Sequence, residues 1–169
     1  MPVRDEIFDF DDIPMDGGMK KLIEQAQEAW RSLKRVDSWE QWKIVAFAVD
    51  GGRHEIMRLL HINGPTGAQY SRAMGAWLSR HGFDEIDKSA RSYLQKCLDN
   101  LTEMEKWRSN ILNQSHRVKL NHPQTVYSNW QKTKKAAVNK SNPRTNAKDE
   151  VIRKLQEELS SDSQVGTQG

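Results

Sequence analysis

Several features are scarce in this chain of 169 residues, and each scarcity excludes a class of protein. Cys97 is the single cysteine, which excludes an internal disulfide and fits a reducing compartment. No uninterrupted apolar run approaches the roughly 18 residues that a membrane helix needs. The N-terminus lacks the basic and then apolar pattern of a signal peptide. We therefore expect a cytoplasmic protein that does not span a membrane.

Catalytic and cofactor motifs are also missing. The sequence has no nucleophile elbow and no dinucleotide fingerprint. His54 and His61 lie seven residues apart and would share a helix face, but two histidines without further ligands do not make a metal site. Cys97 falls on an apparent core stripe, which argues against an activated thiol. The acidic segment 84–87 near His81 suits either acid–base chemistry or the start of a helix. We expect no enzyme activity, no cofactor and no metal.

The charge is unevenly distributed along the chain, although the formal net charge is only +3. Residues 1–30 carry eight acidic residues against three basic ones. Residues 116–154 carry ten Lys and Arg against two acidic residues. Such an asymmetry favours an acidic arm at one end and a basic binding region at the other.

Apolar residues recur at spacings of three and four over most of the chain, which predicts amphipathic helices. Gly51-Gly52 is expected to end one helix before the next begins, because glycine accepts the conformation found after a helix C-terminus. The six tryptophans are interpreted as core anchors. The predicted helices span residues 19–35, 39–49, 53–62, 66–80, 88–98, 102–112 and 123–135, with a short terminal helix at 148–159.

The predicted fold is all-α, a compact multi-helix domain of about six to seven helices. We place this helical domain at residues 19–138. A disordered acidic N-terminal arm precedes it at 1–18. A basic C-terminal tail follows at 139–169, with a linker, the short helix and a disordered end. The apolar stripe of helix 148–159 is too short to be stable alone, so it should dock on the domain or pair with a second chain as a homodimer.

Residues 115–135 are the most informative stretch, because spacing, charge and side-chain type agree there. A short helix, a polar corner and a second helix starting at Pro123 are predicted, since proline suits the first helical turn. Asn121 is expected to accept hydrogen bonds from that turn. Val126 and Trp130 should share an inward face. The candidate nucleic-acid-binding residues are Arg117, Lys119, Gln124, Thr125, Ser128, Asn129, Lys132, Lys134 and Lys135.

The segment Thr125 to Trp130 resembles the recognition helix of helix-turn-helix proteins. The resemblance implies that Val126 and Trp130 pack inward while the residues between them face the DNA groove. The turn departs from that pattern, because Leu120 to Pro123 stand where a small residue or glycine is usual. An amphipathic helix with a core stripe and a solvated basic face is the alternative interpretation.

The N-terminal segment Phe8 to Pro14 resembles the acidic tail of bacterial single-stranded DNA-binding proteins, although it lies at the other end of the chain. In that family the tail docks on partner proteins through acidic residues and an apolar end. The resemblance implies a partner-binding role for Phe8, Phe10, Asp11, Asp12 and Ile13.

Residues 39–130 are similar to a group of uncharacterised helical proteins from proteobacterial genomes and their mobile elements. The similarity rests on Trp-x-x-Trp at 39–42, Gly-Arg at 52–53, Asn-x-Pro-x-Gly around 63–67, a tryptophan-leucine helix, Phe83-x-x-Ile86-Asp87-Lys88, Arg91, Trp107-Arg108 and Leu120-Asn121-His122-Pro123. It implies a small cytoplasmic protein of a bacterium or phage.

Two functions are consistent with these patterns. The first is a DNA-binding protein, with DNA rather than RNA as the expected nucleic acid, that serves as a regulator or accessory factor of a phage or mobile element. The second is a protein–protein interaction module, such as an adaptor or a phage-encoded inhibitor of a host nucleic-acid-handling complex. In the second case the acidic arm would bind the partner.

Overall fold

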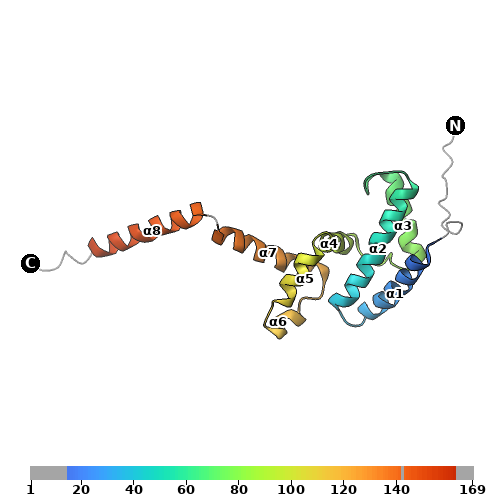
Figure 1. Ribbon diagram of the computed structural model, residues 1–169, viewed down its shortest axis with the longest axis horizontal. Coiled ribbons are helices and arrows are strands. Elements are labelled where there is room, and N and C mark those ends of the chain that lie inside the picture. Colours follow the sequence, from blue (N-terminus) through green and yellow to red (C-terminus); the bar gives the residue numbers. More distant parts are fainter. Residues whose placement is uncertain (1–14, 142, 163–169) are drawn as a thin grey trace, which may run out of the picture. The chain divides into compact units, whose positions relative to one another are not determined.

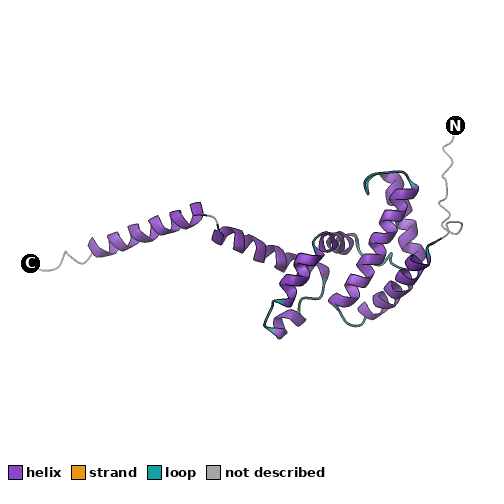
Figure 2. Ribbon diagram, in the orientation of Figure 1, coloured by secondary structure: helices purple, strands orange, loops and turns teal. Residues whose placement is uncertain are grey.

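The structure is a computed structural model that describes residues 15–141 and 143–162, with side chains described for 15–141 and 149–158. Every regular element in these ranges is a helix, which confirms the all-α prediction (Figures 1 and 2). The helices are α1 (Gly17–Leu33), α2 (Trp39–Leu59), α3 (Ala68–His81), α4 (Lys88–Asp99), α5 (Leu101–Ser109), α6 (Gln114–Val118), α7 (Pro123–Ser141) and α8 (Pro143–Asp162). The chain divides into two units, residues 1–127 and 128–169, and the boundary falls inside α7.

Helix α1 packs against α2 through a stripe of small and branched residues. Ile23, Ala26 and Ala29 are buried at spacings of three, as the amphipathic pattern predicts. Asp16 begins the helix by accepting a hydrogen bond from the Gly18 N–H at 3.4 Å. The helix therefore starts at Gly17, within the segment that the sequence assigns to the arm.

Helix α2 corrects the prediction of two separate helices, because it runs without a break through Gly51 and Gly52. Neither glycine has a positive φ, so neither acts as a C-cap. A Cβ added to Gly52 would lie 2.4 Å from Cζ2 of Trp77. A Cβ at Gly51 would lie 2.8 Å from the Met19 methyl carbon. The two glycines allow α1 and α3 to approach the backbone of α2 closely.

Two of the helices end at or just before a residue with a left-handed backbone conformation, and α4 begins at a side-chain cap. His61, with φ 53°, follows the end of α2, and its neighbour Ile62 donates its N–H to the Met57 carbonyl at 3.1 Å. Gly82, with φ 77°, ends α3 as predicted. Asp87 caps α4 by accepting from the Ala90 N–H at 2.7 Å, also as predicted.

The core of the first unit is built on aromatic side chains. The Trp77 and Phe83 rings stack with centroids 6.0 Å apart, and Trp30 contacts Trp42 at 5.7 Å. Of the five tryptophans in this unit, three are buried and two are half-buried, in agreement with a role as core anchors. The largest fully buried side chains are Trp39, Phe83, Ile56, Ile86, Met104, Leu120, Val45, Val126, Pro123 and Cys97.

The second unit comprises the rest of α7 from Ser128 and helix α8. Helix α7 extends to Ser141, six residues beyond the predicted end, and α8 begins at Pro143 rather than at 148. Both helices therefore run through part of the segment predicted as a linker. The apolar residues of α8 whose side chains are described, Val151, Ile152 and Leu155, are each more than half exposed.

The glycine contact at α2 generates a stability prediction. We expect Gly52→Ala to lower the free energy of unfolding by about 1–3 kcal/mol, because the added methyl collides with the buried Trp77 ring. Gly75→Ala on α3 is the matched control, since its Cβ would meet nothing within 4 Å. It should raise stability by up to about 1 kcal/mol through helix propensity. Urea unfolding measures both, and equal effects would contradict the packing role of Gly52.

Candidate nucleic-acid interface

The corner between α6 and α7 has the predicted arrangement of a short helix, a polar turn and a second helix beginning at Pro123. Asn113 starts α6 by accepting from the His116 N–H at 3.1 Å. Pro123 is buried at the first position of α7, where its missing N–H leaves no donor unpaired. The turn of residues 119–122 connects the two helices.

The cap of α7 differs from the prediction, because His122 rather than Asn121 occupies that role. The His122 Nδ1 accepts from the Gln124 N–H at 3.3 Å, and its carbonyl accepts from the Val126 N–H at 2.9 Å. The Asn121 Oδ1 instead lies 3.4 Å from the Trp39 N–H, at the start of α2. Ser38, the residue before Trp39, forms no side-chain cap of its own. Asn121 therefore supplies a cap for a helix 82 residues away in the sequence.

Further contacts fasten the corner to the core of the first unit. Arg108 on α5 donates from Nε to the Leu120 carbonyl at 3.3 Å. The His122 ring meets Trp42 of α2 edge-on, with centroids 5.4 Å apart. Leu120 is 2% exposed. Contacts to α2 and α5 thus fix the point from which α7 starts.

Cys97 lies against the same corner and behaves as a core residue. Its Sγ is 3.7 Å from the Pro123 carbonyl oxygen. Burial raises the pKa of the Cys97 thiol to about 12, so the thiol stays protonated at neutral pH. This agrees with the core position that the sequence predicts.

Helix α7 has one buried side and one outward side. Val126 and Trp130 are buried, at 0% and 3% exposure, as predicted. On the opposite side, spacings of three and four along the helix align a set of polar and basic side chains. Ser128 is half-buried and the others are exposed. This set, called here the outward face, consists of Gln124, Thr125, Ser128, Lys132 and Lys135.

The remaining predicted residues occupy other positions. Lys134 places its Nζ 4.6 Å from the centroid of the Trp130 ring, on the flank of the buried side. Asn129 follows Val126 by three residues and is half-buried. Arg117, on α6, is half-buried, and Lys119, in the turn, is exposed. These four residues therefore lie outside the outward face.

The stretch of sequence that contains the corner carries basic residues and no acidic ones. Between Glu105 and Asp149 the chain contains ten Lys and Arg and no Asp or Glu. The lysines of the outward face thus have no acidic neighbour within their own helix. A surface of this composition attracts phosphates.

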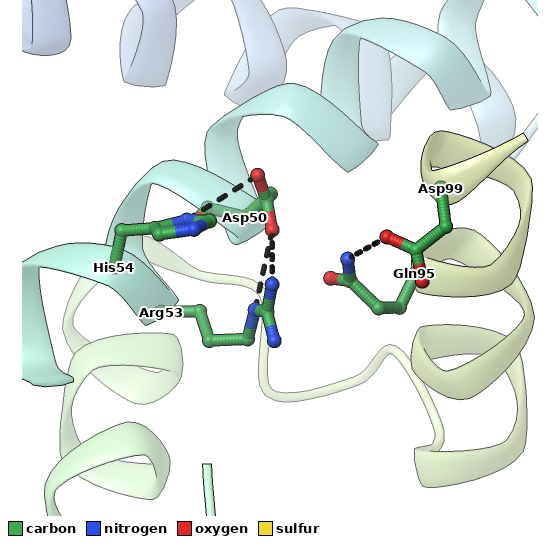
Figure 3. Close-up of polar contacts among 5 residues, drawn as sticks. All are labelled: Asp50, Arg53, His54, Gln95 and Asp99. Atoms are coloured by element: carbon green, nitrogen blue, oxygen red, sulfur yellow. Dashed lines mark hydrogen bonds and ion pairs between the residues drawn. The ribbon is translucent and has the colours of Figure 1, made fainter. Parts of the chain in front are cut away.

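Polar residues on α2 form a separate cluster (Figure 3). Asp50 accepts from Arg53 Nε at 3.2 Å and from its terminal nitrogen at 3.0 Å. His54 Nδ1 lies 2.8 Å from the Asp50 carbonyl. His61 lies beyond the end of α2. The prediction that His54 and His61 share a helix face is therefore wrong. Among the described residues no group of three or more His, Cys, Asp or Glu could hold a metal ion.

The acidic segment near His81 has structural partners. Glu85 forms an ion pair with Lys34, and Asp87 caps α4. His81 lines a cavity of about 370 Å³ between α1, α2 and α3, together with Trp77 and Met19. Burial, with a smaller effect of Arg80, lowers the pKa of His81, so its ring is neutral at pH 7. These contacts explain Glu85 as an ion-pair partner and Asp87 as a helix start.

The proposed partner-binding residues Phe8, Phe10, Asp11, Asp12 and Ile13 lie outside the described residues. Within the described ranges, no helix combines the length and the apolar character needed to cross a bilayer. Comparisons of the chain with protein-family models, curated proteins and solved structures give no match.

The role of Asn121 can be tested by its removal. Asn121→Ala deletes the acceptor for the Trp39 N–H and the side-chain donor to the Val118 carbonyl. We expect a loss of about 1–2 kcal/mol in the free energy of unfolding, measured with urea. Asn110→Ala, at an exposed position after α5, is the control and should change stability by less than about 0.5 kcal/mol. A similar loss in both variants would contradict the capping role.

Proposed function

We propose that this protein binds duplex DNA and that α7 is its recognition helix. The observation that carries the proposal is the outward face of α7, which presents amide, hydroxyl and ammonium groups opposite the buried Val126 and Trp130. An α-helix fits the major groove, where such groups hydrogen-bond base edges. Gln124, Thr125 and Ser128 would face the bases, and Lys132 and Lys135 would contact phosphates.

The character of the aromatic residues supports duplex DNA over a single strand. Proteins that bind single strands offer exposed aromatic rings on which bases stack. Trp130 is buried and Tyr127 is half-buried, and each has a lysine ammonium over its ring. The choice of DNA over RNA rests on groove shape, because the major groove of an RNA duplex is too deep and narrow for side chains to read.

The biological setting forms part of the same proposal. We propose that the protein is a regulator or accessory factor of a phage or mobile element, which is what the resemblance of residues 39–130 to helical proteins of proteobacterial genomes and mobile elements implies. A cytoplasmic location follows from this role, because the DNA is there.

We further propose that two copies pair through α8. A helix with a stripe of exposed apolar residues gains stability by burying it against another helix. Two copies would supply two recognition helices, as in helix-turn-helix dimers that bind two half-sites.

DNA binding is tested by fluorescence anisotropy with a labelled random duplex at several salt concentrations. The affinity of the full chain should fall steeply between about 50 and 200 mM salt, because bound phosphates release counterions. The double variant Lys132→Ala, Lys135→Ala should lower the log–log salt slope by about 1.8, or 0.9 for each lost phosphate contact. Gln124→Ala should alter sequence preference and leave the slope unchanged.

The matched control is Lys20→Ala, Lys21→Ala, which removes two exposed positive charges from α1. Its slope should equal that of the unaltered chain. An equal fall in both double variants would show that net charge, rather than α7, drives binding. Absence of duplex binding at about 50 mM salt would refute the DNA-binding proposal. Deleting residues 1–14, which spares the Asp16 cap, would then test the partner-binding alternative.

Self-association is tested by sedimentation velocity over a range of protein concentrations. We expect a concentration-dependent dimer that the double variant Ile152→Asp, Leu155→Asp abolishes, since charge on the stripe opposes its burial. Val138→Asp, at a position that is 62% exposed on α7, is the control and should leave the dimer intact. A monomer at the highest soluble concentration would contradict pairing through α8.

A further inference from the structure

A lysine on α4 lies over two tyrosine rings, one on α4 and one at the beginning of α7. The rings of Tyr93 on α4 and Tyr127 on α7 contact each other, with centroids 5.9 Å apart. Lys96, on α4, places its Nζ 4.8 Å from the Tyr93 centroid and 5.7 Å from the Tyr127 centroid. Nothing in the pattern of residues 115–135 reveals this contact, because Tyr93 and Lys96 belong to a different helix. The contact places a basic side chain of α4 beside the start of α7.

The two rings restrict where the Lys96 charge can lie. A lysine side chain is flexible, and an exposed lysine normally samples many rotamers. Attraction between the ammonium and the faces of two rings favours the rotamers that keep Nζ beside Tyr127. Tyr127 follows Gln124 by three residues, so the two lie one above the other on α7. The ammonium is therefore held on the flank of the helix from which Gln124 projects.

The charge of Lys96 remains available to an external anion. Lys96 is exposed, and among the described residues no carboxylate forms an ion pair with it. The nearby acid of its own helix, Asp99, accepts a hydrogen bond from the Gln95 amide at 2.9 Å (Figure 3). The tyrosine rings attract the ammonium without neutralising it. A cation held beside a helix that lies in a DNA groove is well placed to contact a phosphate at the edge of that groove.

We propose that Lys96 contacts a DNA phosphate beside the groove that α7 occupies, so that α4 and α7 together hold the duplex. The inference rests on the proposed function of α7. It extends that function in two respects. It adds a second helix to the interface, and it assigns the Tyr93–Tyr127 pair to positioning the Lys96 charge rather than to stacking on bases.

The test uses the full chain and a labelled random duplex. Lys96→Ala should lower the log–log salt slope by about 0.9 and weaken binding to all sequences alike. Lys96→Arg keeps the charge over the rings and should retain the slope. Lys20→Ala removes one exposed charge from α1 and should also leave the slope unchanged. Thermal unfolding of each variant checks that the fold is intact.

The outcomes separate this inference from the function on which it rests. Suppose that Lys96→Ala keeps the salt slope of the unaltered chain while the double variant Lys132→Ala, Lys135→Ala lowers it by about 1.8. The inference about Lys96 is then wrong, and α7 still binds DNA. If Lys20→Ala lowers the slope as much as Lys96→Ala, the effect is one of net charge and the inference is also wrong. If the unaltered chain does not bind duplex DNA, both proposals fall together.

Discussion

The attachment of the 119–123 corner to α2 is the constraint on which the arrangement of the first unit depends. Asn121 caps the Trp39 N–H, and the His122 ring meets Trp42, so two neighbouring residues of the turn contact the first helical turn of α2. The Trp39 indole N–H in turn donates to Glu105 of α5 at 2.6 Å. The corner is thereby fixed by α2, and α2 by α5, which determines where α7 begins.

A fixed starting point gives the two sides of α7 different roles. Pro123 and Val126 are buried, so the first turn of α7 packs with this side inward in the first unit. The outward face then follows from helical geometry alone, because positions four apart point in the same direction. The acid-free segment from 106 to 148 gives this helix a single sign of charge. Buried packing thus determines which polar groups are presented outward, and the proposed function uses those groups.

Local patterns predicted the features that depend on neighbours in the sequence. The periodicity of apolar residues predicted the helical class and the inward side of Val126 and Trp130, and the preference of proline for the first helical turn predicted the start of α7 at Pro123. Features that depend on distant residues were missed. The local sequence Gly51-Gly52 predicts a helix end. In the structure the contact between Gly52 and Trp77 makes it a site of close packing within a continuous helix. In the same way Asn121 caps a helix 82 residues away, and Lys96 of α4 lies over the Tyr127 ring of α7.

The most direct test of the account is an amide NMR titration of the labelled chain with a random DNA duplex. The account predicts that the largest shift changes, lost again when salt is raised, occur at Gln124, Thr125, Ser128, Lys132 and Lys135, while the residues of α1 stay unchanged. Changes centred on α1 to α3, or none at low salt, would contradict the claim that the outward face of α7 binds DNA.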